Sequence, residues 1–364
     1  MVESASLQAR RYVRLLLTLI LYTLMQAQAS AGGSLSDRLQ AGVEDGSLKG
    51  LHSVLMMHDG EEFASAYFEG KDERWGMPLG MKVHGPDTRH DLRSVTKSIV
   101  GLLYAIARDE GIVPEPSASL VKQFPNYVDL AEDTERQKVT IEHALTMTMG
   151  MAWDESLPYT DPRNSEIAME QSSDRYRFIL EQDITGEPGK KLNYSGGATA
   201  IIGKLIANGA GMPLDEYANG RLFEPLGITE YTWIKGRDGE PSAASGLRMR
   251  APDLAKIGQL IVDQGKFNGR QIVSENSLTE MLEPRAQIDT NFQYGHFWYL
   301  LGPIEKPTLA AGFGNGGQRL SVNAENKLVT VIFAGNYNDY NAWKLGVKVI
   351  EEYLVPELKK AGIL

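Results

Sequence analysis

The sequence has no cysteine, no surplus of positive charge and, beyond its start, no long apolar run. The absence of cysteine among 364 residues excludes disulfide bonds, zinc–thiolate sites and a cysteine nucleophile. A formal net charge of -10 lacks the basic surface that proteins turn toward nucleic acid, so no nucleic-acid partner is predicted. No stretch after Leu24 approaches the roughly 20 apolar residues of a membrane helix. The remainder has the composition of an ordinary folded protein.

The N-terminus has the layout of a secretory signal peptide. Three arginines precede an apolar run from Leu15 to Leu24, and small residues follow at Ala27 and Ala29. We therefore predict a leader over residues 1–29, export to the periplasm or the medium, and a mature domain over 30–364. An uncleaved N-terminal anchor is the alternative.

The sequence offers little for binding a metal ion. It contains six histidines, and none forms an H-E-x-x-H or a similar close pair. Each histidine is therefore interpreted as a structural or surface residue. The sequence predicts neither a metal site nor a cofactor.

Strand-like patterns lie at both ends of the mature chain, and helical patterns lie between them. Asp59-Gly60 separates two strand-like runs, which indicates a hairpin, and a second hairpin is predicted around residues 323–326. The segments outside these runs are predicted as a polar lead-in over 32–50, a loop over 70–91, and helices over 94–111, 140–147, 165–181, 198–210, 251–264 and 342–358. The predicted fold is of the α/β (α+β) class, with one antiparallel sheet built from both termini. Its lobes are an α/β lobe over about 45–110 and 290–364 and a mainly helical lobe over about 111–289, with the ligand cleft between them.

The sharpest chemical signal is Ser94-Val95-Thr96-Lys97, an S-x-x-K at the start of an apolar helix. Residues three apart lie on one face of a helix, so the hydroxyl of Ser94 and the amine of Lys97 are neighbours. A serine hydroxyl needs a nearby base, and a lysine serves as one only where burial, away from carboxylates, lowers its pKa. The alternative is that Ser94 only caps the helix.

Two further segments carry candidate residues. Tyr194 follows a Pro-Gly turn, where its phenol can relay a proton, although it can also be an aromatic that only packs. Residues 312–317 match G-x-G-x-x-G, but a hairpin rather than a helix is predicted after them, which argues against a dinucleotide site. We interpret this stretch as a glycine-rich strand edge that approaches a substrate closely, with a plain turn as the alternative.

Together these segments resemble the β-lactamase-related serine hydrolases, which include class C β-lactamases, D-Ala-D-Ala carboxypeptidases, small-ester esterases and 6-aminohexanoate-dimer hydrolases. The resemblance is carried by DLRSVTKSIVGLLYAIARDEGIV, VTIEHALTMTMGMAWDE, EPGKKLNYSGGATAIIGKLI, LFEPLGI, GLRMRAPDLAKIGQLIVDQGKFNGRQIV and GFGNGGQRLSV. It implies the β-lactamase/transpeptidase-like fold, with Ser94 as nucleophile, Lys97 as general base and Tyr194 as acid and base. It also implies an oxyanion hole made by the backbone N–H groups of Ser94 and Asn315, with Phe313 as the alternative to Asn315.

Two departures from the family pattern bear on the substrate. Gly196 stands where the Y-x-N motif has asparagine, and Ala310 or Gly314 stands where the third motif often begins with lysine or histidine. In penicillin-binding members that cation holds the substrate carboxylate. The resemblance is therefore closest to the branch that hydrolyses small esters and linear amides.

We predict a small-molecule ester or amide as the partner of the cleft. Trp153, Tyr159, Gly196 and Gly314 are the predicted pocket residues, and the aromatic ones can shape an apolar acyl site. The alternatives are a β-lactamase or carboxypeptidase, a transacylase that uses the same acyl-enzyme, and a non-catalytic exported binding protein of this fold.

Overall fold

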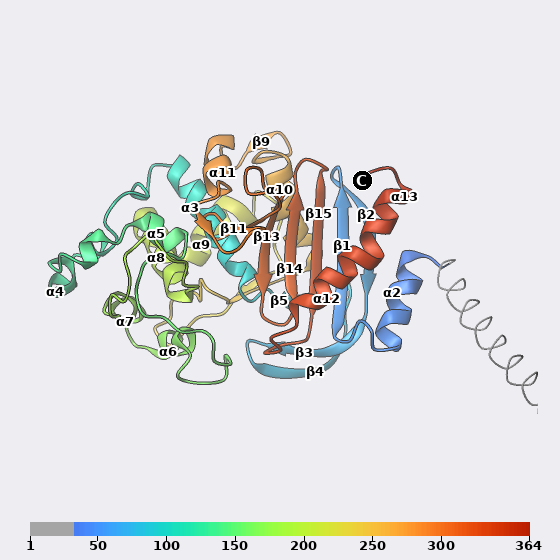
Figure 1. Ribbon diagram of the computed structural model, residues 1–364, viewed down its shortest axis with the longest axis horizontal. Coiled ribbons are helices and arrows are strands. Elements are labelled where there is room, and N and C mark those ends of the chain that lie inside the picture. Colours follow the sequence, from blue (N-terminus) through green and yellow to red (C-terminus); the bar gives the residue numbers. More distant parts are fainter. Residues whose placement is uncertain (1–32) are drawn as a thin grey trace, which may run out of the picture.

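A computed structural model describes residues 33–364. One eight-stranded sheet joins the two ends of this chain, in the order β10-β11-β12-β13-β14-β15-β1-β2 (Figure 1). All its neighbouring strands are antiparallel, and β1 (Leu51–His58) pairs with β15 (Leu328–Ala334) on one side and β2 (Glu61–Tyr67) on the other. The other strands are β10 (Ala286–Gln287), β11 (Phe292–Tyr294), β12 (Tyr299–Leu301), β13 (Leu309–Gly314) and β14 (Gln318–Asn323). The predicted α/β fold with an antiparallel sheet built from both termini is confirmed.

Alternate side chains of the central strands enter two separate cores, because successive residues of a strand point to opposite faces. Val54 and Ile332 pack in a smaller core with Leu354 and Leu358, and Figure 1 shows their helices crossing in front of the sheet. Leu55 belongs to the larger core on the other face. The helices of the smaller core are α2 (Leu35–Glu44), α12 (Trp343–Lys348), a π-helical turn (Val349–Leu354) and α13 (Val355–Lys360).

The larger core contains α3 (Val95–Asp109) and α10 (Ala251–Val262). Gly258 of α10 allows close contact with the sheet, since a Cβ there would lie 2.5 Å from Cγ1 of Val329. Ser98 of α3 donates to the carbonyl oxygen of Phe297 at 2.9 Å. The first contact places α10 against β15, and the second ties the start of α3 to the segment between β11 and β12.

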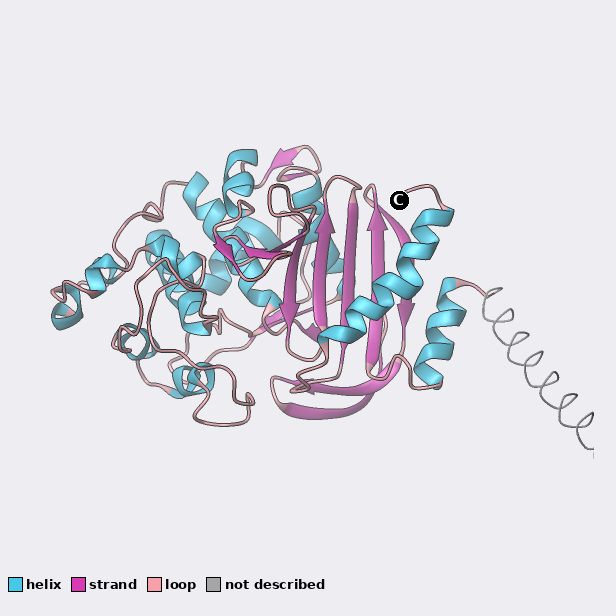
Figure 2. Cartoon of the chain, in the orientation of Figure 1, coloured by secondary structure: helices cyan, strands magenta, loops and turns pink. Residues whose placement is uncertain are grey.

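The remaining helices form the mainly helical part of the chain (Figure 2). They are α4 (Val128–Ala131), α5 (Ile141–Leu145), α6 (Ser165–Gln171), α7 (Arg175–Leu180), α8 (Gly196–Ala210), α9 (Leu214–Ala218) and α11 (Glu275–Met281), with 3₁₀ turns at Val121–Gln123 and Arg136–Lys138 and a π-helical turn at Asn219–Phe223. The single helix predicted over 165–181 is two helices, because Asp174 accepts a hydrogen bond from the backbone of Arg177 and starts a new helix there.

Two other expectations were wrong in detail. The polar lead-in contains α2, whose N-cap Ser34 forms a capping box with Asp37. The loop predicted over 70–91 contains an antiparallel ribbon of β3 (Glu69–Arg74) and β4 (Met77–Val83), which turns at Trp75 and Gly76, both with positive φ. Short strands complete the fold: β5 (His90–Asp91), β6 (Thr232–Trp233), β7 (Leu247–Met249), β8 (Lys266–Phe267) and β9 (Arg270–Gln271).

The predicted leader over residues 1–29 lies outside the described residues. Within residues 33–364, no helix combines the length and the apolar character needed to cross a bilayer.

Candidate active site

Ser94 occupies the N-cap position of α3, directly after the short strand β5. The backbone N–H of Leu92 donates to the carbonyl of Leu247 at 2.9 Å, which fixes the chain that leads into the serine. The side chain of Ser94 makes no capping hydrogen bond. Its hydroxyl is instead 3.2 Å from Nζ of Lys97, so the geometry does not support a role for Ser94 as a simple cap.

Lys97 is buried, with 1% of its surface exposed, and its Nζ has three acceptors. These are Oγ of Ser94 at 3.2 Å, the carbonyl oxygen of Ala244 at 2.9 Å and Oε2 of Glu166 at 3.2 Å. Three acceptors match the three protons of an ammonium group. The amine is thus withdrawn from bulk water, as expected, but it faces a carboxylate, which the sequence did not predict.

Glu166 is the residue that sequence reasoning missed. It lies in the first turn of α6, is 1% exposed, and its Oε1 accepts from the hydroxyl of Ser245 at 2.6 Å. A Cβ at Gly196 would lie 2.5 Å from Oε2 of Glu166. Gly196, which stands where the family motif has asparagine, therefore leaves the space that the Glu166 carboxylate fills. This replacement was the one feature of the sequence that could have indicated a buried carboxylate here.

Tyr194 lies beside the same pair. Its ring centroid is 4.9 Å from Nζ of Lys97. Burial, followed by the neighbouring Tyr299 and Glu155, raises the pKa of Tyr194 well above its usual value. Near neutral pH the phenol is therefore protonated and donates a proton rather than accepting one.

Glu155 connects three of the predicted pocket residues. It accepts from Nε1 of Trp153 at 2.6 Å, from the hydroxyl of Tyr159 at 2.9 Å and from the backbone N–H of Gly196 at 2.5 Å. Burial and the nearby carboxylate of Glu166 raise the pKa of Glu155 to about 7. The Glu155 carboxyl group therefore holds Trp153, Tyr159 and Gly196 in fixed positions.

The third motif ends at the nucleophile. A Cβ at Gly314 would lie 2.4 Å from the carbonyl oxygen of Leu92, so β13 runs directly against the chain before Ser94. Within the described chain, the backbone N–H groups of Ser94 and Asn315 make no backbone hydrogen bond. Phe313, the alternative donor, lies inside the ladder opposite Arg319.

A cleft of about 520 Å³ opens over this cluster, and Ser94, Tyr159, Glu166 and Asn315 are among its lining residues. Trp153 does not line it, because its ring packs in the core beneath Gly197. The other lining residues are mixed in character: Glu73, Trp75, Gly76, Arg93, Thr160, Ile167, Glu170, Gln171, Lys235, Gly236, Arg237, Ser245 and Asn338.

Two of the three cationic side chains that line the cleft are paired with acids. Arg93 contacts Glu73 and lies 3.2 Å from Asp91, and Lys235 lies 3.0 Å from Asp215. The third, Arg237, forms no ion pair within the described residues and lies 3.5 Å from the carbonyl oxygen of Gln171. Ala310, at one of the two positions where the family often has a cation, is buried within β13. Several charged side chains therefore line the cleft, but β13, the strand that carries the third motif above Ser94, has no cation.

An antiparallel sheet backed by helices, with a serine and a lysine on the first turn of a buried helix, defines a class of serine hydrolase folds. A family model described as Beta-lactamase matches residues 35–340, and the chain belongs to this family.

Known proteins support this assignment. A 6-aminohexanoate-dimer hydrolase of Paenarthrobacter ureafaciens is 23% identical over 268 residues, which cover 68% of this chain and 66% of that protein. The solved structure of a putative 6-aminohexanoate-dimer hydrolase from Bacillus anthracis matches with a TM-score of 0.71 and 18% identity, over 88% of this chain and 82% of that one. A penicillin-binding protein from Bacillus halodurans matches with a TM-score of 0.65 and 16% identity, over 85% and 98% of the two chains. The matches cover from 35% to 66% of the lengths of the curated relatives.

Proposed function

We propose that the protein hydrolyses small esters or linear amides through an acyl-enzyme on Ser94. The observation that carries this proposal is the buried contact of 3.2 Å between Oγ of Ser94 and Nζ of Lys97, at the floor of an open cleft. The ring of Tyr194 lies beside them, with its centroid 4.9 Å from Nζ of Lys97. This arrangement satisfies the geometric requirement for a nucleophile with an adjacent base.

The first half-reaction requires that the Ser94 hydroxyl lose its proton. An ammonium cannot accept a proton, so Lys97 first passes one of its protons to Glu166, 3.2 Å away. The neutral amine then removes the proton of Ser94 as Oγ forms a bond to the substrate carbonyl carbon. The negative charge that develops on the carbonyl oxygen is stabilised by the N–H groups of Ser94 and Asn315.

The second half-reaction releases the product and restores the enzyme. Tyr194 donates its proton to the leaving alcohol or amine as the bond to the carbonyl carbon breaks, and regains a proton from Lys97. Water then attacks the acyl-Ser94 ester and gives one proton to the neutral amine of Lys97, which passes it to Oγ of Ser94 as the acid is released. Glu166 finally returns its proton to Lys97, and the starting ion pair is restored.

The cleft favours a small substrate without a β-lactam carboxylate. β13 supplies no cation above Ser94, and two of the three cations that line the cleft, Arg93 and Lys235, are paired with acids. Similarity to a 6-aminohexanoate-dimer hydrolase supports a linear amide as one substrate class. We further propose that the protein is exported, as the composition of its first residues indicates.

A fluorophosphonate probe tests the proposal directly, because it reacts only with activated serines. We expect the wild-type protein to be labelled and the Ser94→Ala variant not to be. Ser98→Ala is the matched control, since Ser98 lies one turn further along α3 and contacts Phe297 instead of Lys97. Equal labelling of the wild type and the Ser94→Ala variant would rule the proposal out. Parallel assays with p-nitrophenyl butyrate, a linear amide and nitrocefin then rank the substrate classes.

A further inference from the structure

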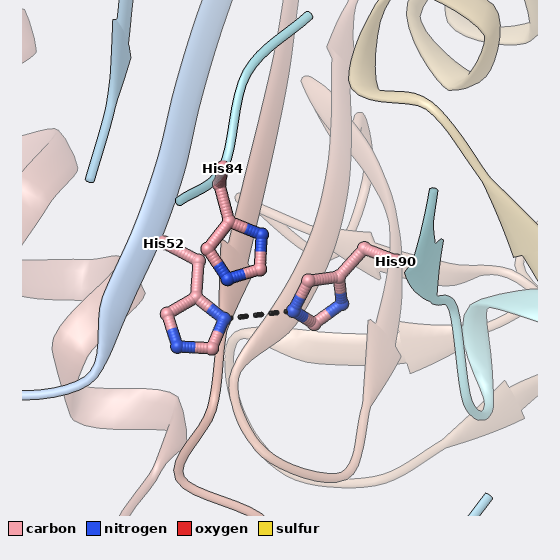
Figure 3. A group of neighbouring side chains, drawn as sticks. All are labelled: His52, His84 and His90. Carbon is pink, nitrogen blue, oxygen red and sulfur yellow. Dashed lines mark hydrogen bonds between the residues drawn. The ribbon is translucent and has the colours of Figure 1, made fainter. Parts of the chain in front are cut away.

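Three histidines, one from β1 and two from β5 and the segment that leads into it, meet in the interior of the protein. His52 comes from β1, His90 from β5, and His84 from the segment between β4 and β5 (Figure 3). All three are buried, and one ring nitrogen of each lies within 4.8 Å of the other two. This is a convergence of imidazole groups, which are common ligands of metal ions in proteins.

Hydrogen bonds determine which nitrogen of His90 faces the centre. Its Nδ1 lies 3.1 Å from the carbonyl oxygen of Asp91, and a carbonyl can only accept, so Nδ1 carries the proton. Its Nε2 therefore presents a lone pair to the cluster. A histidine that donates one N–H to a carbonyl and offers the other nitrogen is the usual arrangement of a metal ligand.

The other two histidines leave nitrogen atoms without partners. Nδ1 of His52 lies 2.9 Å from Nε2 of His90 and must donate to it, so Nε2 of His52 is an unpartnered acceptor. Nε2 of His84 is also buried without a hydrogen-bond partner, and the His84 ring stacks on the His52 ring, with the two centroids 4.1 Å apart (Figure 3). A buried polar atom without a partner is costly, so the free nitrogen of His84 calls for a ligand.

An acidic side chain lies beside the three rings. Asp72 supplies a carboxylate oxygen 3.6 Å from Nε2 of His90, and its other oxygen lies 3.4 Å from the guanidinium of Arg248.

The geometry points to a buried site for a divalent transition-metal ion of the zinc type, held by His52 Nδ1, His84 Nε2, His90 Nε2 and Asp72. Three imidazoles and one carboxylate, without thiolate, are a ligand set for Zn²⁺ and Co²⁺. Binding moves the proton of His52 from Nδ1 to Nε2, so the imidazoles stay neutral and release no proton. Four protein ligands leave no open position, so the ion is structural. It ties β1, β3 and β5 together, and β5 leads within three residues to Ser94.

The test uses untagged, full-length protein freed of metal with a chelator. Addition of Co²⁺ is expected to produce the intense visible bands of a tetrahedral site, saturating at one ion per chain, and Zn²⁺ is expected to abolish them. Zn²⁺ is also expected to raise the melting temperature of the wild type. In His84→Gln both responses should be lost, while His58→Gln, on the same strand as His52 but outside the cluster, should keep both.

Several outcomes would overturn the site. One is a wild type that shows neither the Co²⁺ bands nor a melting shift with Zn²⁺. Another is a His84→Gln variant that binds Co²⁺ with the same spectrum as the wild type. Circular dichroism and gel filtration establish that each variant is folded, and His52→Gln provides a second variant if His84→Gln does not fold. None of these measurements depends on hydrolytic activity.

Discussion

The amine of Lys97 and the carboxylate of Glu166 form a buried ion pair of 3.2 Å, although the two residues lie 69 positions apart. Each side chain is 2% exposed, so the pair is withdrawn from water. Removing one partner of such a pair leaves a buried charge without compensation, which is strongly unfavourable. In the proposed mechanism, this pair consists of the base that Ser94 needs and the group that takes the proton of that base.

Replacing Glu166 with glutamine is expected to slow acylation about 100-fold at neutral pH, because the ammonium of Lys97 loses its proton acceptor. The measurement is the pH dependence of the fluorophosphonate labelling rate. Glu142→Gln is the matched control, as Glu142 pairs with His296 at 3.0 Å and not with the lysine. An unchanged rate and pH profile in Glu166→Gln would exclude this role.

Replacing Tyr194 with phenylalanine removes the phenol but keeps the ring that contacts Lys97. We expect kcat/KM for p-nitrophenyl butyrate to fall about 100-fold or more, which is the usual contribution of a general acid. The melting temperature should change little. Tyr217→Phe, which loses a hydrogen bond to Glu110, is the control for the removal of a partly buried hydroxyl. A Tyr194→Phe variant as active as Tyr217→Phe would contradict the proposed proton donor.

Gly196 and Glu166 are expected to be energetically coupled. A Cβ at position 196 would lie 2.5 Å from Oε2 of Glu166, so Gly196→Ala should reduce the free energy of unfolding by about 1–3 kcal/mol. In a Glu166→Ala background the same change should cost less, because the clashing carboxylate is gone and Cβ of Ala244, at 3.0 Å, is the close neighbour that remains. A double-mutant cycle by urea unfolding measures the coupling. Additive effects of the two substitutions would show that the predicted clash does not occur.

Glu155 is expected to make stability depend on pH near neutrality. Its pKa is raised from 4.5 to about 7, so between these values the folded protein holds a proton that the unfolded chain has lost. Its contribution to stability is therefore greatest at low pH and is lost as the pH rises through about 7, by at most about 1.4 kcal/mol per pH unit.

Glu155→Gln, which stays neutral, should thus gain stability relative to the wild type between pH 5 and pH 8. Urea unfolding at both pH values measures the difference. Asp154→Asn is the control, because Asp154 is exposed and its hydrogen bonds to Ser156 lower its pKa. A constant difference between Glu155→Gln and the wild type at the two pH values would contradict the raised pKa.

Local patterns accounted for much of the fold. The alternation of residues around Asp59-Gly60 predicted the β1–β2 hairpin, and the apolar spacing after Ser94 predicted α3. The ribbon of β3 and β4 was missed, because its glycines, prolines and charges indicate a loop, and the pairing with its partner strand overrides that local preference. The break between α6 and α7 depends on one capping side chain, Asp174.

By itself the sequence determined that Ser94 and Lys97 are neighbours, since three residues of helix place two side chains on one face. Strand patterns at each end of the chain also predicted one antiparallel sheet built from both termini. Only the tertiary structure decided that Glu166 faces Lys97 and that His52, His84 and His90 meet. Such contacts join different segments of the chain, and their geometry depends on how whole helices and strands pack and bury their surfaces. The local periodicity of a sequence carries no information about that packing.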